Sequence, residues 1–174
     1  MFVAVWPDDL TVRRLSALEL GSMPGLRTVR PGQWHVTLRF LGEVDDDIFP
    51  VLVDALGHAA TRIRVPVRCT AGPATAWFDG SRVLQIPVTG LDDVAEAVRQ
   101  ATVPVIPDAG QAPFVGHLTV ARVRGRRPEE SIRTAVAGVA FTAKFAVPRF
   151  LLVASELSPE GPRYSTLVRL PLPT

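Results

Sequence analysis

The feature that most constrains this chain is a four-residue pattern that occurs twice. His35-Val36-Thr37-Leu38 in the first half returns in the second half as His117-Leu118-Thr119-Val120. The chain has only three histidines and 47% of its residues are hydrophobic. Two of the three histidines would fall into His-apolar-Thr-apolar by chance with a probability of roughly one in a thousand. The repeat therefore predicts a chain built from two related halves, each carrying one copy.

Each copy has the composition of a β-strand with two different faces. Residues two apart on a strand point to the same side, so His35 and Thr37 share one face, and His117 and Thr119 do the same. The apolar residues between them face the opposite side and are suited to packing. Trp34 lies on the same face as these apolar residues and is expected in the core. The pattern predicts one polar and one buried face for each of the two strands.

The rest of the chain alternates helix and strand signals around these two copies. We predict strands at 2–6, 34–41, 64–69, 75–78, 82–88, 114–123, 141–145, 149–155 and 164–170, and helices at 8–20, from 45–47 to about 58, 92–101 and 128–136. Asp79-Gly80 is a hairpin signal. The fold class expected is α+β, a bilobed and pseudo-symmetric duplication in which two antiparallel sheets line a central groove and helices lie outside.

Length and composition favour a single globular unit. At 174 residues the chain is long enough for one sizeable core, and we expect one domain over 1–174 made of two intertwined lobes. The best candidate for a boundary between the two lobes is the segment 88–93. Cys69 is the one cysteine, so an intramolecular disulfide is excluded and a buried thiol is expected. No signal peptide or long apolar segment is recognised, which predicts a cytoplasmic monomer without a membrane partner.

Two imidazoles and two hydroxyls on facing strands suggest acid/base chemistry. Imidazole has an unperturbed pKa that allows one copy to be neutral and the other protonated near pH 7. Such a pair suits displacement at phosphorus, with hydroxyl donors holding the non-bridging oxygens. Zinc binding is a minor alternative, because zinc takes three or four ligands and neither motif histidine has a companion ligand nearby. The third histidine, His58, is expected to face solvent or to cap a helix.

These residues resemble the 2H phosphoesterase superfamily, and within it the LigT/ThpR type of RNA 2′,3′-cyclic phosphodiesterase. The resemblance covers nearly the whole chain, in four blocks at 2–5, 35–44, 113–122 and 155–164. One departure is Gly116, where the family usually has proline directly before the second histidine. This change removes a rigid residue beside His117 without touching a catalytic atom.

The resemblance implies opening of a 2′,3′-cyclic phosphate, on RNA ends or nucleotides, to a 2′-phosphate without metal or cofactor. It implies catalytic roles for His35 and His117, which we assign as general acid and general base, with Thr37 and Thr119 holding the phosphate. The alternatives are a 2′-5′ RNA ligase or 2′-5′ phosphodiesterase using the same groove, or a non-catalytic module that binds RNA ends.

The resemblance further implies a phosphate contact for Arg122 and a base-stacking surface for Phe40. Both lie at an odd offset from their histidine, so on a regular strand they would face away from the groove. Either a β-bulge or strong twist re-aims them, or they serve the core and surface. The basic run that begins at Arg122 and continues through 124–127 could steer RNA phosphates, or could be an ordinary solvated loop.

Overall fold

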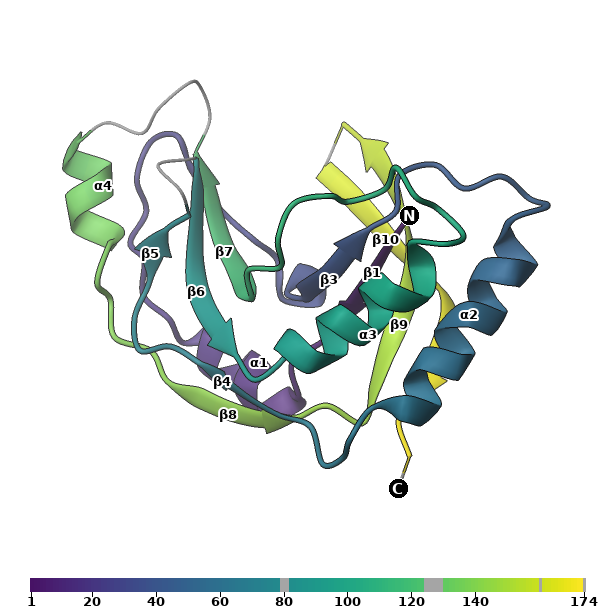
Figure 1. The fold of residues 1–174 in the computed structure, drawn as a ribbon. Helices are drawn as coiled ribbons and strands as arrows, with labels where there is room; N and C mark the ends of the chain where they lie inside the picture. The colour runs from purple at the N-terminus through teal and green to yellow at the C-terminus, as the bar shows by residue number, and fades with distance from the viewer. Residues whose placement is uncertain (79–81, 124–129, 160, 174) are drawn as a thin grey trace.

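The computed structural model describes residues 1–78, 82–123, 130–159 and 161–173 (Figure 1). The hairpin signal at Asp79-Gly80, the basic residues at 124–127 and the start of the fourth predicted helix at 128–129 lie outside the described residues. The helices are α1 (Asp9–Ser16), α2 (Phe49–Arg62), α3 (Asp92–Thr102) and α4 (Glu130–Val136), with a short 3-10 turn, η1 (Pro31–Gln33). The strands are β1 (Phe2–Val5), β2 (Leu26–Thr28), β3 (Val36–Phe40), β4 (Arg68–Ala71), β5 (Ala76–Trp77), β6 (Val83–Thr89), β7 (His117–Val123), β8 (Ala143–Ala146), β9 (Arg149–Ser158) and β10 (Gly161–Pro171).

The strands form two antiparallel sheets, which confirms the predicted α+β class. The first sheet has the strand order β10-β9-β1-β3, and the second has the order β2-β7-β6-β4-β8 with β5 paired to β6. Figure 1 shows the second sheet on the left and the first on the right. One copy of the repeated motif lies on β3 and the other on β7.

The two sheets exchange segments of the chain. The first sheet joins β1 and β3 from the N-terminal part to β9 and β10 from the C-terminal end. Helix α1 follows β1 but contacts β8 of the second sheet, whereas α3 follows β6 but contacts β3 of the first. Helix α2 contacts both α3 and β10. Each sheet therefore contacts a helix that, in the order of the chain, follows a strand of the other sheet.

One apolar cluster connects the two lobes. It includes Val3 and Val36 of the first sheet, Ile86 and Leu118 of the second, and Leu52 of α2, all of them fully buried or nearly so. Trp34 is 5% exposed and belongs to this cluster, as its parity predicted. Cys69 is buried and free, and burial raises the pKa of its thiol to about 12.

Several predicted boundaries were wrong. Helix α1 ends at Ser16 rather than near residue 20, and α2 begins at Phe49 rather than at 45–47, because Pro50 occupies its first turn, where a missing N–H costs nothing. Strand β3 begins at Val36, after η1. Strand β4 begins only at Arg68, because Pro66 cannot donate to a sheet. Strand β2 was not predicted at all.

Candidate active site

The two motif strands start close together and then diverge. Strands β3 and β7 contact each other, and in Figure 1 both run upward from the middle of the molecule, away from one another. We call the faces that carry His35 and Thr37 on the first sheet, and His117 and Thr119 on the second, the site side. On the first sheet, helices α2 and α3 pack behind the opposite face.

Each motif strand contains a β-bulge at the fourth residue of the motif. On β3, Thr37 pairs with Ala4 while Arg39 pairs with Val3, so Leu38 is the extra residue. On β7, Thr119 pairs with Gln85 while Ala121 pairs with Leu84, so Val120 is the extra residue. A bulge reverses the alternation of faces beyond it. The duplication thus extends to an irregularity at the same motif position in both strands.

The bulges turn Phe40 and Arg122 to the site side. Phe40 pairs with Phe2, which shares a face with the partner of Thr37, and Arg122 pairs with Val83, which shares a face with the partner of Thr119. The bulge that was one of the two expected explanations for their odd offset is therefore present in both strands. Phe40 is 63% exposed, which leaves its ring available for a ligand.

Each imidazole is oriented by a backbone carbonyl two residues before it. Nδ1 of His35 lies 2.7 Å from the carbonyl oxygen of Gln33, and Nδ1 of His117 lies 2.8 Å from that of Val115. A carbonyl can only accept, so each Nδ1 carries the hydrogen and donates it. Nε2 is left as the nitrogen that can gain or lose a proton at the site.

His35 lies among aromatic rings that come from distant parts of the chain. Its ring centroid lies 5.0 Å from Phe2, 5.1 Å from Trp6 and 5.1 Å from Tyr164. Trp6 is stacked on it, and Tyr164 meets it edge-on. Phe2 and Ala4 with Val153, against which Trp6 and Tyr164 pack, form a small apolar cluster separate from the main core. This cluster fixes the orientation of the first imidazole.

Burial and nearby charge make His35 hard to protonate. Desolvation lowers its pKa below the ordinary value of 6.5, its hydrogen bond to Gln33 raises it, and the charges of His117 and Arg122 lower it again. Arg122 also lowers the pKa of Tyr164, although burial raises that pKa more. Arg122 on the second sheet is therefore near enough to the first sheet for its charge to act on His35 and Tyr164.

His117 is held by an aromatic ring and by a close backbone approach. The ring of Phe78, just after β5, lies 4.5 Å from its centroid. The carbonyl of Gly116 accepts a 2.8 Å hydrogen bond from the N–H of Val88, and a Cβ placed on Gly116 would lie 2.2 Å from the carbonyl oxygen of Val88. The glycine that departs from the family pattern thus allows an approach that a side chain would prevent.

The remaining polar groups stand beside the threonines. Thr37 and Thr119 are half-buried. Gln85 lies directly opposite Thr119, is 8% exposed, and its Oε1 has no hydrogen-bond partner within the described chain. The contributors missed from the sequence include the rings of Phe2, Trp6 and Phe78 and the amide of Gln85. No local pattern marks them, because strand pairing alone brings them to the motifs.

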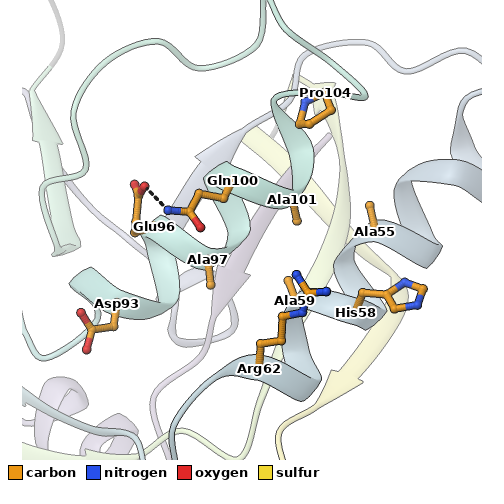
Figure 2. Close-up of a pocket in the computed structure, with 10 residues that line it drawn as sticks. All are labelled: Ala55, His58, Ala59, Arg62, Asp93, Glu96, Ala97, Gln100, Ala101 and Pro104. Carbon is orange, nitrogen blue, oxygen red and sulfur yellow. Dashed lines mark hydrogen bonds between the residues drawn. The ribbon is translucent and has the colours of Figure 1, made fainter.

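A hollow of about 470 Å³ lies elsewhere, between α2 and α3. Figure 2 shows short alanine side chains between the two helices and polar side chains at the rim, where Glu96 accepts a 2.8 Å hydrogen bond from Gln100. It is lined by Ala55, His58, Ala59, Arg62, Asp93, Glu96, Ala97, Gln100, Ala101 and Pro104. His58 is exposed and bonds to the carbonyl of Asp54 in its own helix, which confirms a solvent-facing histidine. This hollow contains neither motif histidine.

Within the described residues, no three His, Cys, Asp or Glu side chains come together as a possible metal site. Among the same residues, no helix is long and apolar enough to cross a membrane.

Two antiparallel sheets, each presenting one His-x-Thr-x strand to a shared site, define a 2H phosphoesterase. A model of the LigT-like phosphoesterase family matches residues 9–71, which include the first motif. The solved structure of TT0787 of Thermus thermophilus is similar, with a TM-score of 0.82 and 30% identity over 98% of this chain and 96% of that one. The chain therefore belongs to the LigT-like phosphoesterases.

Other similar proteins agree with this assignment. A curated protein of Thermus thermophilus named RNA 2′,3′-cyclic phosphodiesterase is 29% identical over 99% of this chain and 89% of its own length. One of the same name from Archaeoglobus fulgidus is 27% identical over 96% and 97%. The structure of E. coli LigT complexed with 3′-AMP has a TM-score of 0.76 and 25% identity over 99% and 97%.

Proposed function

We propose that this protein hydrolyses 2′,3′-cyclic phosphate ends of RNA or nucleotides to 2′-phosphates. The observation that carries the proposal is the matched pair of imidazoles, one from each sheet, each held through Nδ1 with Nε2 left for proton transfer. Three curated relatives named RNA 2′,3′-cyclic phosphodiesterase support the substrate class.

The proposed step is an in-line displacement at phosphorus. Neutral His117 removes a proton from water as the water oxygen forms its bond to phosphorus. The bond between phosphorus and the 3′ oxygen breaks, and protonated His35 gives its proton to that oxygen. The products are a 2′-phosphate and a free 3′-hydroxyl, and the two imidazoles have exchanged protonation states. Ligation would use the same pair in the same direction, with a 5′-hydroxyl in place of water as the group that His117 deprotonates.

Neighbouring residues supply the binding contacts in this proposal. The hydroxyls of Thr37 and Thr119 donate to the non-bridging oxygens, where charge develops, and Arg122 contributes a fork of donors that suits phosphate. The exposed ring of Phe40 stacks on the nucleobase. We propose that the reaction requires no cofactor or metal ion.

The lowered pKa of His35 bears on the proposed roles. In the ligand-free protein it favours neutral His35, whereas an acid must be protonated. A bound phosphate anion beside His35 raises the pKa of that imidazole, because an opposite charge nearby favours the charged form. The substrate therefore supplies the interaction that charges His35, which ties protonation of the acid to occupancy of the site.

The reaction can be tested directly with a 2′,3′-cyclic nucleotide in the presence of EDTA. We expect conversion to the 2′-phosphate, identified by ³¹P NMR, with a bell-shaped dependence of rate on pH. A 3′-phosphate product would contradict the proposed direction of ring opening, and loss of turnover in EDTA would contradict metal independence. Tight RNA binding without product at any pH would identify a binding module, and joining of RNA ends would identify a ligase.

The site as described requires one copy of the chain. Both histidines and both threonines come from the same polypeptide, so we propose that the protein acts as a monomer. We also propose that it acts in the cytoplasm, on RNA made there.

A further inference from the structure

Arg27 is a second arginine beside the site that the motifs do not include. It lies in β2, the strand that was not predicted, and pairs directly opposite Arg122 across β2 and β7. Directly opposite residues point to the same face of a sheet, so Arg27 lies on the site side. Both arginines are exposed, and within the described ranges the guanidinium of neither forms a hydrogen bond or an ion pair.

Two like charges in this position are unfavourable without a ligand. Side chains directly opposite on antiparallel strands lie about 5 Å apart at Cβ, and like charges there repel. A bound anion would convert the repulsion into attraction, and guanidinium forks match the oxygens of a phosphate. The pair therefore has the geometry and charge of a phosphate site.

The position of Arg27 separates it from the reacting phosphate. Arg122 is close enough to His35 for its charge to lower the pKa of that imidazole. β2 is the edge strand, on the far side of β7 from β6. Arg27 pairs with Arg122, which lies five residues along β7 from His117, so Arg27 is at the end of the strand pair away from that histidine.

We propose that Arg27, with Arg122, binds the phosphodiester on the 5′ side of the terminal nucleotide. This proposal rests on the proposed function and specifies its substrate: an RNA strand of at least two nucleotides is bound better than a cyclic mononucleotide. Phe40, at the corresponding place on β3, faces the base from the first sheet. The terminal nucleotide is thereby held between the ring of Phe40 on the first sheet and the two arginines on the second.

The test compares kcat/KM for a cyclic mononucleotide with that for a dinucleotide ending in a 2′,3′-cyclic phosphate. Arg27→Gln removes the charge at similar length, Arg27→Lys keeps it, and Arg14→Gln removes an exposed arginine on α1 that belongs to neither motif strand. We expect Arg27→Gln to lower the dinucleotide-to-mononucleotide ratio about tenfold, mainly through KM, as for loss of one charge-assisted hydrogen bond. Arg27→Lys should recover part of the ratio, and Arg14→Gln should not change it.

Equal losses on both substrates, or no change in the ratio, would overturn the role of Arg27. Failure of wild type to turn over either substrate would instead contradict the proposed function. In that case, calorimetric binding of a dinucleotide with a 3′-phosphate decides the matter. Loss of the contact in Arg27→Gln should weaken binding and reduce the slope of log affinity against log salt by about 0.7, whereas an unchanged slope would refute the contact.

Discussion

His35 and His117 are equivalent in the motif but not in their surroundings. His35 contacts Phe2, Trp6 and Tyr164, whereas His117 contacts Phe78. The larger aromatic surface desolvates His35 and lowers its pKa. The same four-residue pattern therefore stands in two different surroundings, and at His35 those surroundings disfavour the protonated imidazole.

The lowered pKa of His35 predicts a measurable dependence of stability on pH. Below its ordinary pKa of 6.5, unfolded His35 binds a proton more readily than folded His35, so the free energy of unfolding falls as the pH falls through this range. Urea denaturation between about pH 5 and 8 should show a weaker dependence for His35→Gln than for wild type. The exposed His58→Gln is the matched control and should keep the wild-type slope. An unchanged slope in His35→Gln would contradict the prediction.

Gly116 provides a second test at single-residue scale. An added Cβ would meet the carbonyl oxygen of Val88 at 2.2 Å, so Gly116→Ala should destabilise the fold by about 1–3 kcal/mol and reduce activity by displacing His117. Gly57, in α2, has open space where its Cβ would be, so Gly57→Ala should stabilise by about 1 kcal/mol. Similar effects of the two substitutions on thermal unfolding would show that the close approach at Gly116 is not restrictive.

At the scale of elements, Arg39 fastens α3 and the following loop to the motif strand. The bulge at Leu38 sends Arg39 to the face opposite Phe40, where it is 5% exposed. It donates to the carbonyls of Arg99, Ile106 and Ala109 and to the hydroxyl of Thr102. The carbonyls of Arg99 and Ile106 also accept from the backbone N–H groups of Val103 and Ala109, so Arg39 adds a second donor at the end of the helix and in the loop that follows it. The bulge at Leu38 thus determines two orientations: the ring of Phe40 faces the site side, and the side chain of Arg39 points into the interior.

Removing that support should affect the loop more than the helices. Arg39→Met keeps the apolar stem but removes the donor to the buried carbonyl of Ala109 and to the hydroxyl of Thr102, so we expect a loss of about 2–4 kcal/mol and faster amide hydrogen exchange in 103–110. Glu96→Gln removes only the exposed ion pair with Arg99 and should change stability far less. Unchanged exchange in the loop of Arg39→Met would contradict the role given to Arg39.

The elements also show how far sequence reasoning extends. The motif strands and α3 were predicted because their apolar spacing is regular. Strand β2 was missed because its three residues lie between Gly25 and Pro31 and carry no alternation of their own. Strands β9 and β10 run beyond their predicted ends because hairpin pairing holds residues, such as Gly161, that read locally as a turn. The bulges depend on register between strands, which no short pattern encodes.

At the scale of the whole molecule, the lobes share structure and cannot readily separate. The first sheet uses both ends of the chain, and the main apolar cluster includes residues of both sheets. We therefore propose a single folding unit. Unfolding followed by tryptophan fluorescence and by far-ultraviolet circular dichroism should give one coincident transition. Two separate transitions would indicate lobes that fold independently.

The proposed function depends on two proton transfers: His117 takes a proton from water, and His35 gives one to the 3′ oxygen that leaves the cyclic phosphate. The most direct measurement compares His35→Ala and His117→Ala on a 2′,3′-cyclic nucleotide and on its analogue with sulfur as the 3′ bridging atom, because a thiolate leaves without a proton. With the natural substrate, each variant should lose a factor of about 10²–10⁴ in rate. With the sulfur analogue, His35→Ala should recover and His117→Ala should not. Recovery of His117→Ala instead would reverse the roles, and full activity of either variant on the natural substrate would contradict the two-histidine mechanism.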